Sequence, residues 1–275
     1  KPPVSVSTKV VYEALDSEEI IEHPDIDALI EGLKQKDLHR ISENMGNVLE
    51  DVTIPMHPVI EELKQVMREN GAIPAEKGFP SGVKGVPAFP GSICASVNDV
   101  VIHGIPSKRE ILHDGDIISV DLVAYKNGFN GDCCRTYFVG NVSEEAKRLT
   151  EVTKQSFYEG IKYAKKGFRL GDICHAIGEY VEKNGYSVVR EFQGHGIGES
   201  MHEDPGIPNY GKAGRGIRLE PGMTLAIEPM VIMGKPNILE LDDGWTIITE
   251  DGSLAAHYEN TILITENEPE ILTLL

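Results

Sequence analysis

Carboxylates stand at the ends of apolar, β-branched segments in this chain. Asp121 closes the run 117–120, and Glu228 closes the run 223–227 and is followed by Pro229. Proline cannot continue a central strand, so the second of these strands ends with its acid directed at whatever the sheet edge faces. Burying a carboxylate without a partner costs on the order of several kcal/mol. The pattern therefore predicts strands that bring acids together around a metal ion or another cation.

A tight turn would place two acids on one face of a sheet. The dipeptide Asn127-Gly128 predicts a hairpin. With the turn at that place, residue 121 lies opposite residue 134, and Asp132 is the diagonal neighbour of Asp121. Two carboxylates at that separation repel, and one takes up a proton unless cations neutralise them. A solvated pair of acids on an exposed face is the alternative.

One histidine and one further glutamate have metal-ligand chemistry in similar settings. His195 lies in Gly194-His195-Gly196-Ile197-Gly198, where we expect the flanking glycines to adopt unusual dihedrals and bring the ring close to other groups. Glu259 stands just before the apolar run 261–264. The alternatives are an ordinary core or surface histidine and an exposed glutamate at the start of a strand.

Together these side chains form an oxygen-rich ligand set with one imidazole and no thiolate: Asp121, Asp132, His195, Glu228 and Glu259. Four carboxylates balance two divalent cations, and they can bridge a pair of metals about 3.5–4 Å apart. This set predicts a catalytic pair of Mn, Fe, Co or Zn ions and disfavours a structural zinc site. With a water between the ions, such a centre is suited to hydrolysis.

Composition excludes several classes of function. Of 275 residues 40% are hydrophobic, and 26 Lys and Arg against 44 Asp and Glu give a net charge of −18. This charge repels phosphate backbones and anionic lipid headgroups, so we expect neither direct nucleic-acid binding nor membrane binding. The absence of any long apolar run predicts no signal peptide and no membrane span. Four cysteines without framework spacing indicate reduced thiols in a cytoplasmic protein.

The order of predicted elements indicates an α+β fold. Residues 1–37 form an acidic N-terminal extension, and residues 38–275 form one catalytic domain. Periodicity predicts helices over 38–49, 59–70, 144–166 and 171–184, and strands over 93–103, 117–125, 135–139, 187–191, 223–227, 245–249 and 257–265. The loop 78–91, rich in Pro and Gly, is a candidate lip over a site. Helices followed by strands, twice over, favour two helix-plus-antiparallel-sheet halves with approximate internal symmetry.

Three short motifs around the ligand set carry a resemblance to a known family. They are Val100-Val101-Ile102-His103-Gly104-Ile105-Pro106, Gly194-His195-Gly196-Ile197-Gly198 and Ile227-Glu228-Pro229-Met230. With the five ligands in order, the chain from about residue 38 onward closely resembles type I methionine aminopeptidase. The resemblance implies the pita-bread fold, a cytosolic location, and removal of the initiator methionine from new proteins whose second residue is small.

The resemblance also implies a role for each ligand. By it, Asp121 binds one metal, Asp132 and Glu259 bridge both, and His195 and Glu228 complete the other site. Glu228 is in addition the expected proton shuttle between the attacking water and the leaving amine.

Outside the ligands, the resemblance implies two accessory histidines and a pocket. His202 would stabilise the developing oxyanion, and His103 would position the scissile amide. The methionine side chain would enter a soft, apolar pocket formed by Phe89, Cys94 and Trp245, with Met201 as a further wall. Met201 and Asn260 depart from the family pattern, in which an aromatic residue and a histidine are common.

Two alternatives remain at this point. An X-Pro aminopeptidase or dipeptidase shares the fold but usually carries an extra domain before the metal core. A non-catalytic binding module on this fold would have lost metal ligands, whereas all five are present here. The short interval between His195 and Glu228 favours type I over type II, which has an insertion there. The expected partners are nascent polypeptide N-termini, with transient association with ribosomes, and we expect a monomer.

Overall fold

The computed structural model describes residues 71–107 and 110–273, and the residues from Ala72 onward form a unit of their own. The helices expected over 38–49 and 59–70, and the boundary between residues 37 and 38, lie outside the described residues. The described part combines two long helices with antiparallel sheets, so its class is mixed α+β.

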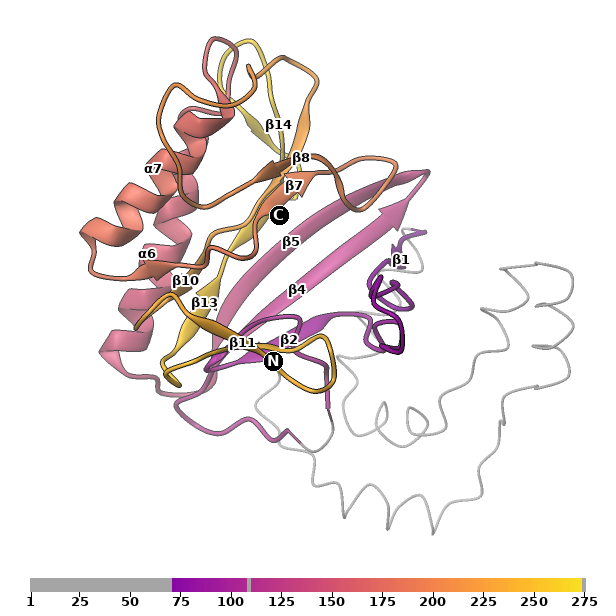
Figure 1. Ribbon diagram of the computed structural model, residues 1–275, viewed down its shortest axis with the longest axis vertical. Helices are drawn as coiled ribbons and strands as arrows, with labels where there is room; N and C mark the ends of the chain where they lie inside the picture. Colours follow the sequence, from indigo (N-terminus) through magenta and orange to yellow (C-terminus); the bar gives the residue numbers. More distant parts are fainter. Residues whose placement is uncertain (1–70, 108–109, 274–275) are drawn as a thin grey trace, which may run out of the picture. The chain divides into compact units, whose positions relative to one another are not determined.

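A long hairpin supplies two neighbouring strands of the main sheet (Figure 1). Strands β4 (Ile117–Lys126) and β5 (Phe129–Phe138) pair antiparallel along their whole length. Asn127 and Gly128 form the turn with φ of 52° and 91°, the left-handed geometry that two-residue hairpins require. Asp121 lies opposite Cys134, so the predicted register is confirmed.

Seven further strands extend this hairpin into a sheet of nine, ordered β1-β4-β5-β14-β9-β7-β8, with β2 paired to β4 and β15 to β14. They are β1 (Ile73–Pro74), β2 (Cys94–Val97), β7 (Gly194–Gly196), β8 (Glu203–Ile207), β9 (Thr224–Ile227), β14 (Glu259–Leu263) and β15 (Glu270–Ile271). Segments far apart in sequence thereby become neighbours, which is how residues from five strands reach one site.

The two faces of this sheet differ in polarity. Helices α6 (Glu144–Ile161) and α7 (Leu170–Lys183) lie side by side along one face in Figure 1. Leu225, Ile227 and Ile262 belong to the core that these helices bury. Successive residues of a strand point to opposite faces, so Glu228, next to Ile227, and Glu259, three residues before Ile262, point away from the helices.

Both helices were predicted, and their ends are instructive. Ser143 caps α6 by accepting a hydrogen bond from the Ala146 backbone N–H at 3.1 Å. The prediction of a helix to residue 166 is wrong, because α6 ends at Ile161. Lys165 instead forms a parallel bridge with Thr265, so pairing with a distant segment draws the chain out of the helix. Helix α7 agrees with its prediction to within one residue at each end.

Two small sheets complete the described part. One has the order β13-β10-β6 and the other β11-β12-β3. Their strands are β3 (Val100–Ile102), β6 (Ser187–Val188), β10 (Met230–Ile232), β11 (Ile238–Glu240), β12 (Ile247–Thr249) and β13 (Ala255–His257). A separate core, which includes Val101, Met230 and Ile247, packs where these sheets meet.

Several predicted strands have different bounds in the structure. The segment 93–103 divides into β2 and β3, because Asn98 adopts a left-handed φ of 53° and turns the chain. The segment 257–265 belongs to two strands in different sheets, β13 and β14, which meet at Tyr258. The strands predicted over 187–191 and 245–249 are shorter, ending at Val188 and beginning at Ile247.

The loop over 78–91 is closed by its own hydrogen bonds. Gly78 N–H donates to Phe89 O and Phe89 N–H donates to Phe79 O, each at 2.9 Å. Trp245 Nε1 donates to Pro87 O at 2.9 Å and ties the loop to the β11–β12 hairpin. The backbone pairing between the two ends of the loop therefore fixes the positions of Phe79 and Phe89.

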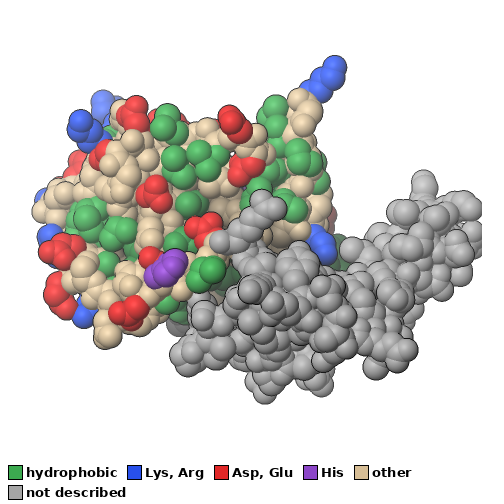
Figure 2. All heavy atoms as spheres, turned by 90° about the horizontal axis from the view of Figure 1, so that it is seen from below, with side chains coloured by type: hydrophobic (Ala, Val, Ile, Leu, Met, Phe, Trp, Pro, Cys, Tyr) green, Lys and Arg blue, Asp and Glu red, His purple; other side chains and the backbone are tan. Residues whose placement is uncertain are grey.

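No helix within the described residues is both long and apolar enough to cross a membrane. On the face shown in Figure 2, acidic side chains are scattered among hydrophobic and uncharged ones, and Lys and Arg side chains lie mainly at the margins of the described part.

Candidate metal centre

A cavity of about 650 Å³ opens on the polar face of the main sheet. Every site residue predicted from the sequence lines it: Phe89, Cys94, His103, Asp121, Asp132, His195, Met201, His202, Glu228, Trp245 and Glu259. The fold thus brings all the predicted ligands, both accessory histidines and the predicted pocket residues to one place.

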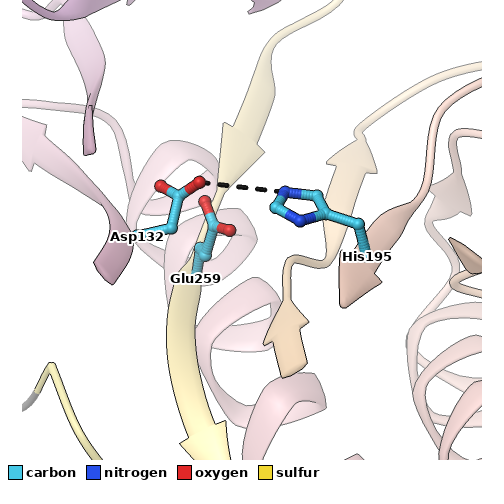
Figure 3. Close-up of side chains that lie close together, drawn as sticks. All are labelled: Asp132, His195 and Glu259. Carbon is cyan, nitrogen blue, oxygen red and sulfur yellow. Dashed lines mark ion pairs between the residues drawn. The ribbon is translucent and has the colours of Figure 1, made fainter. Parts of the chain in front are cut away.

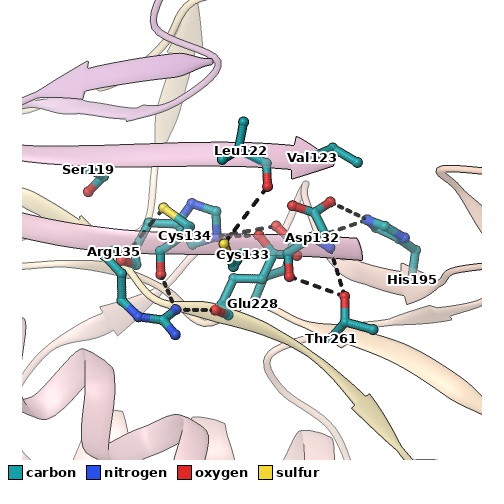
Figure 4. A network of polar contacts seen from close by, with 12 residues as sticks. Ser119, Leu122, Val123, Asp132, Cys133, Cys134, Arg135, His195, Glu228 and Thr261 are labelled. Carbon is teal, nitrogen blue, oxygen red and sulfur yellow. Dashed lines mark hydrogen bonds and ion pairs between the residues drawn. The ribbon is translucent and has the colours of Figure 1, made fainter. Parts of the chain in front are cut away.

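Strand register is the reason that the acids converge. Asp121 on β4 lies opposite Cys134 on β5, which lies opposite Glu259 on β14. Two residues along each strand, the backbone N–H of Asp132 donates to Thr261 Oγ1 at 2.8 Å, and that hydroxyl donates to Asp132 O at 3.1 Å (Figure 4). Ligands on adjacent strands therefore occupy two neighbouring rows on the same face.

His195 enters this site as a neutral imidazole with a defined tautomer. Its Nδ1 lies 2.9 Å from Gly196 O, and because a carbonyl only accepts, Nδ1 carries the proton. Its Nε2 lies 3.8 Å from Asp132 Oδ2 (Figure 3) and 3.8 Å from Glu228 Oε1. Burial lowers the pKa of His195 to about 4. A lone pair facing two carboxylates is the arrangement that a cation between them stabilises.

The pKa values of the acids also indicate that a cation is needed at this site. Burial raises the pKa of Glu228 to about 8 and that of Asp121 to about 6, and it raises the pKa values of Asp132 and Glu259 well above their usual range. Among the described residues, nothing hydrogen-bonds the buried oxygens Asp121 Oδ1, Asp132 Oδ1 and Glu259 Oε1. Ligand atoms of Asp132, His195 and Glu259 all lie within 4.8 Å of one another. The donor set and its unpartnered oxygens fit divalent metal ions.

Glu259 is almost fully buried, at 2% exposure, so an exposed glutamate at a strand start is excluded. Arg135 reaches the same strand from the opposite face. Its Nη1 donates to Glu259 O, and its guanidinium stacks on Tyr258 with 4.4 Å to the ring centroid. Arg135 Nη2 donates to Asn260 Oδ1 at 2.6 Å, so Asn260, one of the two departures from the family pattern, lies behind the ligand row and holds this strand.

One residue of the cluster, His257, was missed by the sequence analysis. It is buried, with Nε2 3.4 Å from Glu228 Oε2 and 3.8 Å from Glu259 Oε2. Ligand atoms of Glu228, His257 and Glu259 lie within 4.8 Å of one another. The signal was present, because residues two apart on an extended segment share a face and His257 precedes Glu259 by two positions.

The glycines around His195 act differently from the prediction. Neither Gly194 nor Gly196 has a left-handed φ, so the expectation of unusual dihedrals is wrong. A Cβ at Gly194 would collide with the Ala226 carbonyl, and one at Gly196 would collide with the Asp204 carbonyl. Their role is to let strands β9 and β8 approach the strand that carries His195.

The two accessory histidines have different aromatic neighbours. The His202 ring is edge-on to His195 at 4.4 Å between centroids and to Phe79 at 5.2 Å. His103 is edge-on to Phe192 at 5.7 Å and to Trp245 at 6.2 Å. Its backbone has a left-handed φ of 56°, a strained conformation often found at functional sites. Burial lowers both pKa values, that of His103 to about 4, so both rings are neutral near pH 7.

Comparison with known proteins agrees with this geometry. The model of metallopeptidase family M24 matches residues 34–266. A methionine aminopeptidase of Clostridium acetobutylicum is 55% identical over 208 residues, which are 76% of this chain and 80% of that protein. The chain belongs to the methionine aminopeptidases of metallopeptidase family M24. The predicted family, of type I, is therefore confirmed.

Solved structures separate this family from the alternative on the same fold. The methionine aminopeptidase of Thermotoga maritima matches with a TM-score of 0.73 and 46% identity, covering 78% of this chain and 83% of that one. The prolidase of Pyrococcus furiosus matches with a TM-score of 0.54 and 26% identity, covering 66% of this chain but 49% of that one. The pita-bread α+β fold is confirmed, and the X-Pro alternative is not favoured.

Proposed function

We propose that this chain removes the N-terminal methionine from nascent proteins and peptides with a small second residue, using two divalent metal ions. The observation that carries the proposal is the lone pair of His195 Nε2, which faces Asp132 and Glu228 beside unpartnered oxygens of Asp121 and Glu259. Asp132 and Glu259 would bridge the ions, Asp121 would bind one, and His195 and Glu228 would complete the other. The ions are Co, Mn, Fe or Zn, which suit this oxygen-rich set.

Metal ions at such a site polarise a carbonyl and lower the pKa of a water. The other steps belong to the protein. Glu228 would take a proton from the attacking water and pass it to the leaving amine. Its carboxylate is held between two rings, with Oε1 3.8 Å from His195 Nε2 and Oε2 3.4 Å from His257 Nε2.

The accessory histidines supply hydrogen-bond donors to the substrate. His202 lines the cavity and is exposed, and it donates to the carbonyl oxygen as negative charge develops on it. His103 holds the scissile amide, because the ring contacts of Phe192 and Trp245 fix its orientation. Both rings are neutral near pH 7. Each therefore donates through its single N–H, and neither has to lose a proton before substrate binds.

The methionine side chain enters the apolar part of the cavity. Phe89 and Trp245 meet edge to face at 5.2 Å, and the buried thiol of Cys94 and the half-buried Met201 add polarizable sulfur surface. Burial raises the pKa of Cys94, so this thiol is neutral and serves as a wall rather than as a nucleophile. A flexible thioether is the side chain that such a slot fits best.

The remaining proposals concern the cellular setting. Nascent N-termini are the natural substrates, which implies transient association with ribosomes, and we expect a cytoplasmic monomer. The net charge of −18 supports an enzyme that binds no nucleic acid directly.

Peptide cleavage tests the proposed activity. Protein stripped of metal should be inactive on Met-Ala-Ser and should recover when Co, Mn or Fe is added, while Ala-Pro-Ser should remain uncleaved. Preferential cleavage of Ala-Pro-Ser would favour the X-Pro alternative. If the folded protein cleaves neither peptide with any metal, the result would favour the non-catalytic binding module.

A further inference from the structure

A buried acid outside the ligand set also lines the cavity. Glu76 follows β1 and is only 6% exposed, although its neighbour Lys77 is exposed. The sequence around it, Ala75-Glu76-Lys77-Gly78, resembles an ordinary charged loop. Burial of a carboxyl in a cavity wall needs a physical reason.

One oxygen of Glu76 has a structural role. Strands β1 and β2 pair with the same edge of β4, β1 with Ala124 and Tyr125 and β2 with 118–121. Between them the Val123 backbone N–H has no strand to bond, and it donates to Glu76 Oε1. The carboxyl thus takes the place of a backbone carbonyl in the gap.

The second oxygen is not used by this contact. Glu76 Oε2 is buried and has no hydrogen-bond partner among the residues described. Glu76 itself lines the cavity together with Phe89, Cys94 and Trp245, the proposed methionine pocket. A bound group that donates to or accepts from this oxygen would supply the missing hydrogen bond. A purely structural role for Glu76 would leave the oxygen without a partner.

The state of Glu76 is consistent with a donor at that oxygen. Burial raises its pKa to about 8, with a smaller contribution from Asp121 in the same direction. The carboxyl is therefore mainly protonated near neutral pH. Since Val123 occupies Oε1 with a donated hydrogen bond, the proton resides on Oε2.

We propose that Glu76 is a specificity-determining residue that donates a hydrogen bond from Oε2 to the sulfur of the substrate's methionine side chain. The proposal rests on the proposed function, since it assigns the occupant of the pocket. A thioether sulfur accepts hydrogen bonds weakly, whereas the methylene that replaces it in norleucine accepts none. Glu76 thereby distinguishes methionine from an apolar side chain of the same shape.

Paired substrates isolate this contact. The ratio of kcat/KM for Met-Ala-Ser to that for norleucine-Ala-Ser is measured in the metal-loaded wild type and in Glu76→Gln, Glu76→Leu and Lys77→Leu. Glutamine keeps an acceptor for Val123 and a donor for sulfur, so its ratio should stay within about twofold of the wild type. Leucine removes both, and the ratio should fall by about fivefold, the effect of one modest hydrogen bond. Lys77→Leu, the matched exposed neighbour, should leave the ratio unchanged.

Each contrary outcome is distinct. An unchanged ratio in a folded Glu76→Leu protein means that Glu76 is only a cap for β4, and a higher ratio in Glu76→Gln means that Oε2 carries no proton. If the leucine variant does not fold, the wild type and Glu76→Gln decide the question. Equal cleavage of both peptides by the wild type overturns the proposal. A methionine preference of about fivefold or more in the wild type, retained in Glu76→Gln, supports it. Failure of the wild type to cleave Met-Ala-Ser with any metal would refute the proposed function itself.

Discussion

At the scale of single residues, the chemistry of the ligands was predictable, but some of their supporting groups were not. Acids at the ends of apolar runs and a histidine between glycines are visible in sequence, because few other arrangements would bury such groups. His257 is set apart only by its position two residues before Glu259, and Glu76 is not set apart at all. Their burial depends on which distant strands close over them, which composition and periodicity do not report.

His257 gives the first prediction at this scale. If its ring orients Glu228 and Glu259 for metal, replacing it with alanine should weaken metal binding by about 10- to 100-fold, as is typical for groups that support ligands. Calorimetric titration of the metal-free variant with Mn measures the effect. His113→Ala, at an exposed position, is the control and should bind like the wild type. Equal affinities in the two variants would remove His257 from the metal centre.

At the scale of elements, long periodic segments and the Asn127-Gly128 turn were predicted well, and short strands were not. Strands β7 and β8 escaped prediction because glycine and charged residues dominate them. Their pairing comes from the close approach of neighbouring backbones, which no local preference encodes. The hairpin register was predictable because a two-residue turn fixes every pair that follows it.

Gly194 tests the importance of that close approach. A methyl group there would collide with the Ala226 carbonyl, so Gly194→Ala should separate β7 from β9, destabilise the fold by about 1–3 kcal/mol and displace His195. Gly131→Ala is the matched control, since its Cβ would meet only Thr273 Cγ2 at 3.6 Å. Denaturant unfolding of both variants gives the comparison. A Gly194 variant as stable as the control would show that the strands tolerate the extra atom.

At the scale of the whole molecule, the acids of the site couple folding to metal and to pH. Their pKa values in the folded, metal-free protein are raised above the unfolded value of about 4. The unfolded chain therefore loses these protons first as pH rises. The stability contributed by the protonated carboxyls is complete below about pH 4 and is lost as pH rises through the folded values, about 6 for Asp121 and about 8 for Glu228.

This linkage predicts a pH-dependent effect of metal removal. The melting temperature of metal-free protein should fall between about pH 5 and pH 8.5, and the increase on adding Mn should be larger at the higher pH, because metal replaces the protons that the acids have lost. Differential scanning calorimetry with and without metal gives both quantities. A melting temperature that rises over this range in metal-free protein would contradict the linkage.

The central claim is that the acids of neighbouring strands and a neutral histidine hold the metal ions. The most direct test is anomalous X-ray scattering from crystals grown with Mn, measured at an energy where Mn scatters. We predict anomalous density in the cavity between Asp132, His195 and Glu259, and its loss in Asp132→Asn crystals. A crystal in which Mn occupies other sites while this one stays empty would contradict the account.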